Sequence, residues 1–406
     1  MKIAFISWEY TPFLVGGLGI YSLNMTRKFV EKGNEVSVFT MNPKNSKEFE
    51  EKNGIKIYRF SFLDSSKTIS IFANSDILSW GKGLKLFSDI FNYNFLLTKK
   101  FTELQKREKF DIIAVHDWIS AFSGLMLKQT KVPIVFHLHS VEEIRNFPGS
   151  ETLKRLEREM AKEANKVITV SESMRDFVGS IGYDKEKISV CWNGTDPEAF
   201  DPKKVDLELV EKLKERYKIR EEKIVFFIGR LVWFKGIYNL VKAMSFVLKE
   251  FPNTKLIMVG IGESENLMQE VKALGLEKNI VLVNKWLSDE EKLAHFYLAD
   301  VCVFPSINEP FGIVASEAMA MEKPVVVGAS GVSGFKEQVV PSGEKRTGVH
   351  VDGNSPQDVA WGIKEVLGNL EEAKKWGKNG RELVLEKFNF ELTATKTLSI
   401  YESLLK

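Results

Sequence analysis

The chain has 406 residues, 44% of them hydrophobic, and its 57 lysines and arginines nearly balance its 55 aspartates and glutamates. This length is enough for about two to three domains, and the even charge gives no reason to expect a nucleic-acid-binding protein. Its two cysteines, Cys191 and Cys302, lie far apart in apolar runs, which excludes a disulfide framework and favours a cytoplasmic protein. The N-terminal MKIAFISWEY is too short and too soon charged for a signal peptide. No run of about 18 apolar residues predicts a membrane-spanning segment.

The first half alternates short apolar runs with amphipathic helical segments, of which 18–33 is the first. Near-continuous apolar strands of this kind are buried on both faces, so they predict a parallel sheet flanked by helices. The half is therefore predicted to be one doubly wound α/β domain. Its predicted strands cover 2–7, 35–40, 111–116, 133–139, 166–171 and 188–192.

The pattern restarts after NGTDPEAFDPKK (193–204), whose composition is that of a linker or hinge. Two Rossmann-like domains in tandem are thus predicted, with a cleft between them, and ligands in such sheets bind outside the carboxyl ends of the strands. The predicted strands of the second domain cover 223–230, 254–260, 279–286, 301–306, 324–330 and 347–351.

Glycines follow the first predicted strand in YTPFLVGGLG, where Gly16, Gly17 and Gly19 precede a helix. The spacing is neither that of a dinucleotide-binding loop nor that of a Walker loop. One interpretation is that Gly16 and Gly17 let the backbone approach a ligand phosphate or sugar at a helix N-terminus. The other is a tight strand-to-helix turn without a ligand.

Three histidines and an aspartate end two neighbouring strands of the first domain: His116, Asp117, His137 and His139. Because successive strand residues face opposite sides, His137 and His139 point to the same face, and one of them is open to a structural role. A metal site would need further carboxylate or cysteine ligands, and the sequence contains no Asp-x-Asp motif. No metal is therefore predicted.

Two cations, Arg230 and Lys235, follow the first strand of the second domain on a single loop. Their spacing lets both converge on one anionic group, such as a diphosphate, although an isolated pair of this kind is often only solvated. A cation aimed at a leaving phosphate typically contributes about 3 kcal/mol or more to transition-state stabilisation.

The stretch EPFGIVASEAMA (309–320) places two glutamates around a run that begins a helix near Gly312. The free amides of Phe311, Gly312 and Ile313 are predicted to bind a phosphate at the positive end of the helix dipole. Glu317, further along the helix, then suits the vicinal hydroxyls of a ribose. Glu309, on the other side of the phosphates, suits a sugar.

Taken together, GGLG, HDW, FHLHS, NGTD, GRLVWFKG, PSINEPFGIVASEAMA and PVVVGASGVSG resemble the retaining GT-B glycosyltransferases. This group includes glycogen and sucrose synthases and many family 4 sugar transferases. The resemblance implies two Rossmann-like domains facing a central cleft, an N-terminal acceptor domain (1–195) and a C-terminal nucleotide-sugar donor domain (196–387). It also implies a final helix, about 388–406, that packs back on the first domain.

The resemblance carries roles onto the donor domain. Arg230 and Lys235 match the pair that binds the diphosphate and stabilises its departing charge. Glu317 matches the ribose-binding glutamate, and Glu309 matches the glutamate that contacts the hydroxyls of the donor sugar.

It also carries roles onto the acceptor domain. His139 matches a histidine set against the donor sugar, and Gly17 belongs to the loop that faces the diphosphate. Asp117 and Asn193 match positions that line the cleft. The residues predicted to act in catalysis are Arg230, Lys235, His139 and Glu309.

The implied reaction moves a hexosyl group, favoured as glucosyl, from a nucleoside diphosphate sugar to a hydroxyl with retention, by front-face attack and without metal or other cofactor. ADP-glucose and UDP-glucose are the favoured donors, and a glycogen synthase-like α-glucan glucosyltransferase is the first choice. Leu14 departs from the lysine that those synthases carry two residues before the glycine pair. A family 4 transferase acting on a sugar, sugar phosphate or lipid-linked glycan is the alternative. A sugar-nucleotide 2-epimerase and a non-catalytic sugar-nucleotide binding protein are more distant ones.

Two segments remain without a predicted chemical role. The phenylalanines of 59–101 are predicted to pack the core of the first domain, with an acceptor-binding or peripheral membrane-touching surface as the alternative. The charged stretch RLEREMAKEANK (155–166) is predicted to be a solvated helix face.

Overall fold

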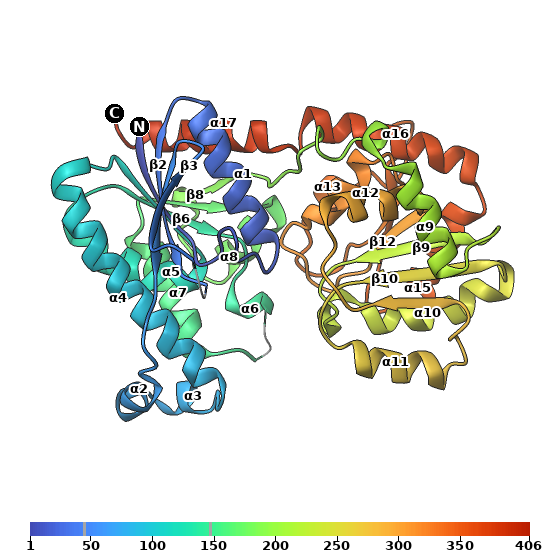
Figure 1. Cartoon of the computed structure of the whole chain (residues 1–406), viewed down its shortest axis with the longest axis horizontal. Coiled ribbons are helices and arrows are strands. Elements are labelled where there is room, and N and C mark those ends of the chain that lie inside the picture. Colours follow the sequence, from blue (N-terminus) through green and yellow to red (C-terminus); the bar gives the residue numbers. More distant parts are fainter. Residues whose placement is uncertain (44–45, 146–147) are drawn as a thin grey trace. The chain divides into compact units, whose positions relative to one another are not determined.

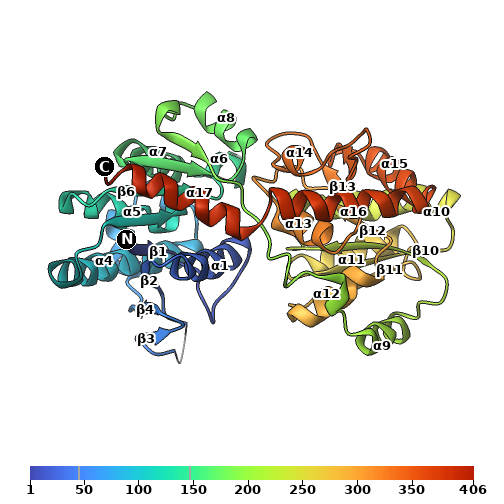
Figure 2. The same cartoon turned by 90° about the horizontal axis from the view of Figure 1, so that it is seen from above.

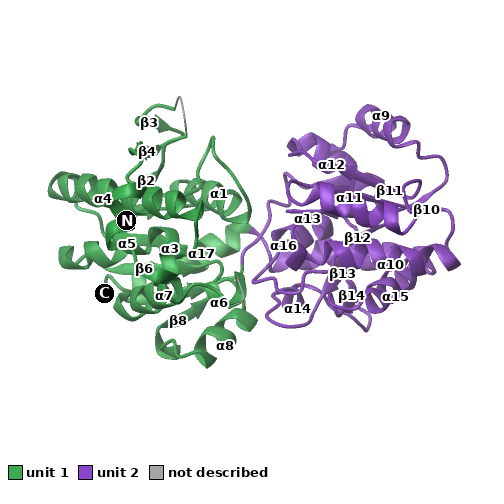
Figure 3. Ribbon diagram, turned by 90° about the horizontal axis from the view of Figure 1, so that it is seen from below, with its two compact units in different colours: residues 1–192, 390–406 green, residues 193–389 purple. Residues whose placement is uncertain are grey.

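The computed structural model describes residues 1–43, 46–145 and 148–406. These residues form two compact units (Figure 3): unit 1 comprises 1–192 and 390–406, and unit 2 comprises 193–389. The domain boundaries predicted from the sequence, 195/196 and 387/388, differ from the boundaries of these units by only a few residues. Each unit is a doubly wound α/β domain built on one sheet, and the predicted fold class is confirmed.

Unit 1 contains an eight-stranded sheet of order β3-β4-β2-β1-β5-β6-β7-β8, in which only β3 runs antiparallel to its neighbour. Six strands were predicted, whereas the hairpin of β3 and β4 was missed. β3 reads FEEK and lies largely exposed at the sheet edge, so it has no apolar run for a sequence pattern to detect. The strands are β1 (Lys2–Ile6), β2 (Glu35–Met41), β3 (Phe49–Lys52), β4 (Ile55–Phe60), β5 (Ile112–His116), β6 (Ile134–Leu138), β7 (Lys166–Thr169) and β8 (Ile188–Val190).

Helices cover both faces of this sheet, with α1 beside the final helix α17 on one face and α4, α5 and α7 on the other (Figure 1). Tyr401 of α17 packs against Phe29 of α1 and bonds through its hydroxyl to His137, so the end of the chain is part of the core of unit 1. The helices are α1 (Gly17–Glu31), α2 (Ser66–Phe72), α3 (Ser75–Leu78), α4 (Gly83–Glu108), α5 (Asp117–Leu127), α6 (Glu142–Arg145), α7 (Glu151–Glu163), α8 (Glu172–Ser180) and α17 (Phe390–Ser403), with 3-10 turns η1 (Lys128–Thr130) and η2 (Lys185–Lys187).

The phenylalanines of 59–101 divide between core and surface. Phe101 on α4 is fully buried, as predicted, but Phe72 on α2 is 82% exposed and Phe95 on α4 is 58% exposed. The core prediction is therefore wrong for these two side chains. No helix of the described residues is long and apolar enough to cross a bilayer.

Unit 2 contains a six-stranded, all-parallel sheet of order β11-β10-β9-β12-β13-β14, and all six strands were predicted. Its strands are β9 (Lys223–Ile228), β10 (Thr254–Val259), β11 (Ile280–Val283), β12 (Val301–Phe304), β13 (Val325–Gly328) and β14 (Gly348–Val351).

In unit 2, helix α10 packs against α11 and α15, α9 packs against α12, and α13 packs against α16. Figure 2 shows α16 lying along α13. The helices are α9 (Leu207–Tyr217), α10 (Ile237–Glu250), α11 (Ser264–Ala273), α12 (Asp289–Leu298), α13 (Ile313–Ala320), α14 (Phe335–Gln338), α15 (Pro356–Leu367) and α16 (Leu370–Glu386), with 3-10 turns η3 (Pro202–Lys204) and η4 (Trp233–Lys235).

The stretch 193–204 was predicted to be a linker or hinge, but most of it packs on unit 2. Phe200 is buried, and its carbonyl accepts a hydrogen bond from Arg381 of α16 at 2.9 Å. The Thr195 amide donates to the carbonyl of Phe388 at 3.1 Å. A Cβ at Gly194 would come within 2.3 Å of the Asn389 backbone. The incoming and outgoing chains of unit 2 thus lie side by side, and the prediction of a linker or hinge is wrong for most of 193–204.

Candidate functional site

The strongest candidate site lies in unit 2, at the carboxyl ends of the neighbouring strands β9 and β12. Lys235, at the end of η4 after β9, forms an ion pair with Glu309, on the loop after β12. The same carboxylate oxygen of Glu309 accepts from the Ser306 hydroxyl at 3.1 Å. Glu309 is 8% exposed, so the pair is largely withdrawn from water. The structure therefore joins two predicted site residues that are 74 positions apart.

Helix α13 begins immediately beyond this pair. Gly312, its N-cap, has φ 92°, and a Cβ there would stand 2.2 Å from the Phe335 ring and 2.9 Å from the Glu309 side chain. Only glycine fits that backbone and that space. Within the part of the chain that the structure describes, no acceptor binds the amides of Phe311, Gly312 or Ile313. The start of the helix therefore presents unpaired donors at its positive end.

Glu317 lies one turn further along α13, a helix that is buried on nearly all sides. Its side chain is 7% exposed, and burial raises its pKa while the ammonium of Lys292 opposes that shift. Lys292, on α12, has its own pKa raised chiefly by Glu317. No hydrogen bond to the Glu317 carboxylate occurs among the described residues, so the carboxylate keeps its acceptor capacity for a ligand.

Arg230 does not share an anion with Lys235 in this structure. It is exposed, and its guanidinium lies 5.5 Å from the centre of the Phe234 ring. The two cations nevertheless come from the same loop after β9, and the long arginine side chain is unpaired among the described residues.

In unit 1, the three predicted histidines form one stack at the ends of β5 and β6. The His116 ring centre is 4.5 Å from that of His137 and 5.6 Å from that of His139. His137 is structural, because its Nε2 bonds to the hydroxyl of Tyr401 at 2.7 Å and its Nδ1 lies 3.3 Å from that of Tyr21. No group of three or more potential ligands among the described residues is arranged to hold a metal ion.

Unlike His137, whose two ring nitrogens are paired, His116 has a buried Nε2 without a partner among the described residues, and so does His139. Burial lowers the pKa of His139 to about 3, so the ring is neutral at physiological pH. A neutral imidazole with one unused polar nitrogen is a group that a ligand would satisfy.

Asp117 opens α5 in the left-handed conformation, with φ 53°. Its Oδ1 accepts from the amides of His139 at 2.8 Å and Ser140 at 3.4 Å, so it positions the His139 backbone. Burial raises the pKa of Asp117 to about 6, against the opposing charge of Arg145.

Arg145 belongs to a buried ionic network that the sequence did not indicate. Its guanidinium lies 2.5 Å from Glu157 and 3.3 Å from Glu142, and Glu157 has no exposed surface. The prediction that 155–166 is only a solvated face is therefore wrong at Glu157. Burial raises the pKa of Glu157 to about 7.

The glycine loop of unit 1 is occupied by a residue of this chain. One carboxylate oxygen of Glu9 accepts from the amides of Val15 and Gly16, both at 3.0 Å, and of Gly19 at 3.2 Å. The Gly16 amide, predicted to face a ligand, is thus already paired, whereas Gly17 is exposed. Sequence reasoning missed Glu9 because the nest of amides that it fills exists only once the loop has folded.

One further placement completes the predicted set. Asn193 is 5% exposed, and its Oδ1 has no partner among the described residues.

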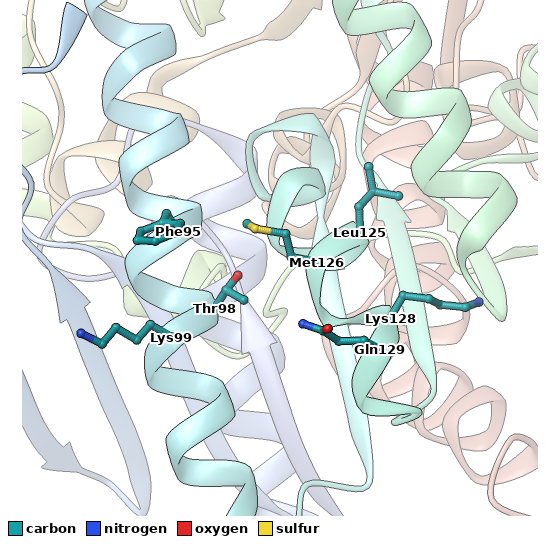
Figure 4. A pocket seen from close by; sticks show the side chains of 7 residues that line it. All are labelled: Phe95, Thr98, Lys99, Leu125, Met126, Lys128 and Gln129. Atoms are coloured by element: carbon teal, nitrogen blue, oxygen red, sulfur yellow. The ribbon is translucent and has the colours of Figure 1, made fainter. Parts of the chain in front are cut away.

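A hollow between α4 and α5, lined by Phe95 and Met126 among others (Figure 4), contains no predicted site residue. It lies at the end of α5 away from Asp117, and so away from the carboxyl ends of the strands.

Family models match both halves of the chain: the model for glycosyl transferases group 1 matches residues 210–383, and that for glycosyltransferase family 4 matches residues 15–199. A glycosyltransferase of Methanocaldococcus jannaschii is 32% identical over 418 residues, with 99% of this chain and 98% of that protein covered. The glycogen synthase of Mycobacterium tuberculosis is 26% identical, with 99% and 94% covered. The D-inositol 3-phosphate glycosyltransferase of Corynebacterium glutamicum is 27% identical, with 99% and 96% covered.

Solved structures share the arrangement of elements along the whole chain. The sucrose-phosphate synthase of Thermosynechococcus elongatus superposes with a TM-score of 0.79 at 24% identity, with 99% of this chain and 98% of that one covered. Anabaena HepE in complex with UDP and glucose superposes with a TM-score of 0.77 at 20% identity, with 99% and 100% covered. At these identities the likeness concerns the fold.

Proposed function

Because this chain belongs to the group 1 glycosyltransferases, we propose that it transfers a hexosyl group, favoured as glucosyl, from a nucleoside diphosphate sugar to a hydroxyl with retention of configuration. The proposal includes a front-face reaction, in which the leaving phosphate helps to remove the acceptor proton, without a metal ion. Neither the front-face reaction nor its independence of metal follows from family membership alone.

One observation carries the proposal: donors and acceptors that suit a nucleoside diphosphate sugar gather at one edge of the unit 2 sheet. The unpaired amides at the start of α13 suit a phosphate. The Glu317 carboxylate, one turn on, suits the vicinal hydroxyls of a ribose. Glu309, fixed by Lys235 and Ser306, keeps further acceptor sites for hydroxyls of the donor sugar.

The cations supply the charge stabilisation that the reaction needs. In the proposed complex, the Lys235 ammonium is held by Glu309 next to the diphosphate, and the exposed Arg230 side chain moves onto it. A fixed positive charge stabilises the leaving diphosphate more strongly as its negative charge develops, which lowers the barrier. The unpaired Nε2 of His139 supports the proposed place of this ring against the donor sugar.

For the acceptor, an α-glucan is the first choice, and a sugar, sugar phosphate or lipid-linked glycan is the second. The M. tuberculosis relative is named a glycogen synthase, whereas the C. glutamicum relative at nearly the same identity is named an inositol phosphate transferase. Leu14 packs against Gly19 at the start of α1 and brings no cation to the glycine loop. The choice between these acceptors therefore depends on the side chains of unit 1, and experiment has to decide it.

The decisive experiment measures nucleoside diphosphate release from ADP-glucose, UDP-glucose, UDP-N-acetylglucosamine and GDP-mannose, with and without glycogen, in the presence of chelator. Glycogen-dependent release from a glucose donor would establish a metal-independent glucan synthase. Activity only with another donor, or none with glycogen, would favour the second choice. Loss of all release on adding chelator, and recovery with Mg²⁺, would contradict the metal-free proposal.

Lys235→Ala tests the assigned cation in the same assay. We expect turnover to fall by a few hundredfold, because one electrostatic contact to the transition state contributes about 3 kcal/mol. Lys285→Ala is the control, since Lys285 pairs with Glu291 on the surface of the same unit. A fall of less than threefold for Lys235→Ala would reject its assigned role.

A further inference from the structure

We propose that a hollow in unit 1, between α3, α4, α5, α6 and α7, binds the sugar ring of an uncharged glycan acceptor. The hollow has a volume of about 480 Å³ and is lined by Trp80, Trp118, Asp76, Glu142, Arg145 and Leu86, among others. The proposal rests on the proposed function and specifies its acceptor.

Two tryptophans form the apolar walls of the hollow. Their ring centres lie 6.3 Å apart with the ring planes at 87°, an edge-to-face contact. Trp118 is 8% exposed, so Trp80 supplies the more accessible aromatic surface. Trp80 is half-buried, and its ring is held against Phe87 at 5.9 Å. Rigid aromatic faces of this kind suit the C–H face of a pyranose, and the indole N–H groups add donors at their edges.

A carboxylate stands beside the aromatic walls in a fixed orientation. Asp76 Oδ2 accepts from the Ser150 hydroxyl and from the Thr152 amide, both at 2.8 Å. Burial opposes ionisation of Asp76, but these bonds together outweigh it and lower the pKa, so the group is ionised at neutral pH. An ionised carboxylate has about four acceptor sites, and those left over suit the hydroxyls of a sugar.

The charges of the hollow disfavour a phosphorylated acceptor. Its cation, Arg145, is bound to two carboxylates, those of Glu142 and Glu157. The lining therefore holds two carboxylates, Asp76 and Glu142, against one guanidinium, and a phosphate placed there would meet net negative charge at short range. The hollow thus favours a neutral sugar over a sugar phosphate.

The position of the hollow connects it to the reaction. Trp118 follows Asp117 directly, and Asp117 begins α5 at the carboxyl end of β5. Ligands of doubly wound sheets bind at this edge. A glycan seated on the tryptophans would therefore extend past Asp117, which was predicted to line the cleft.

Binding of maltotriose to the full chain without donor, followed by saturation-transfer NMR and by tryptophan fluorescence, tests the proposal directly. We expect binding by the unmodified protein and a loss of at least tenfold in affinity for Trp80→Ala, with affinity largely restored in Trp80→Phe. Trp361→Ala, at an exposed position of α15 in unit 2, is the control and should bind normally. Unchanged maltotriose binding by a folded Trp80→Ala protein would overturn the proposal, as would tighter binding of glucose 6-phosphate or inositol phosphate at the same site.

The kinetic counterpart separates this proposal from the proposed function. Trp80→Ala should raise the KM for the glycan at least tenfold while the KM for the donor and the slow donor hydrolysis without acceptor stay within twofold. A rise in the donor KM instead would overturn the assignment to the acceptor. If the unmodified protein transferred no sugar at all, the proposed function would fail, yet the donor-free binding measurement would still decide whether the hollow binds a glycan.

Discussion

Replacing Lys235 by methionine removes the ammonium opposite Glu309 but keeps a side chain of similar length. Glu309 would then retain only the Ser306 hydroxyl, 3.1 Å away, as a partner on that oxygen. Breaking a buried ion pair by removing one partner costs about 3–5 kcal/mol. Because the two side chains keep 18% and 11% of their surface exposed, we expect a smaller loss for unit 2, about 2 kcal/mol in the free energy of unfolding.

A double-mutant cycle measures this interaction. In a domain of about 200 residues, 1 kcal/mol lowers the melting temperature by about 2–4 °C, so Lys235→Met should lower it by about 4–8 °C in calorimetry. Adding Glu309→Gln should recover most of that loss, since the unpaired charge is then gone. Lys285→Met, which opens a more exposed pair, is the matched control and should cost less than about 1 kcal/mol.

Two results would refute the reasoning. One is a fall in the melting temperature for Lys235→Met that is no larger than the fall for the Lys285→Met control. The other is a double variant whose loss equals the sum of the two single losses, because additive effects mean that the side chains do not interact.

Three further changes test other parts of the structure. Burial raises the pKa of Asp117 to about 6, so its ionisation costs no stability below about pH 4 and costs about 3 kcal/mol above pH 6. Asp117→Asn should therefore raise the melting temperature at pH 8 and not at pH 4; an equal gain at both would contradict the assigned burial. Tyr401→Phe removes the 2.7 Å bond to His137 and should destabilise unit 1 by about 1–2 kcal/mol, whereas no change in thermal unfolding would show the bond to be dispensable. Glu317→Ala should weaken the binding of UDP or ADP by roughly tenfold to a hundredfold, as expected for lost hydrogen bonds to a charged group, and unchanged calorimetric affinity would count against its place at the ribose.

The amino-acid sequence by itself determined the fold class and pointed to most residues of the candidate site in unit 2. Twelve strands were predicted correctly because buried parallel strands are continuous apolar runs, which need no knowledge of their neighbours. The residues of this candidate site were predicted at the ends of such strands, and parallel strands bring these ends to one edge. Lys235 and Glu309 therefore meet as the order of strands requires. The roles assigned to them stay predictions.

Only the tertiary structure decided which polar groups are already paired. The sequence does not show that Glu9 fills the amides of the glycine loop, nor that Arg145 binds Glu157 inside unit 1. Nor does it show that Trp80, on the segment before α4, lies beside Trp118 of α5. Each of these contacts joins residues whose local patterns look like surface, loop or core. Whether a charge is solvated, paired or left for a ligand depends on what the folded chain brings within a few ångströms, and no local periodicity carries that information.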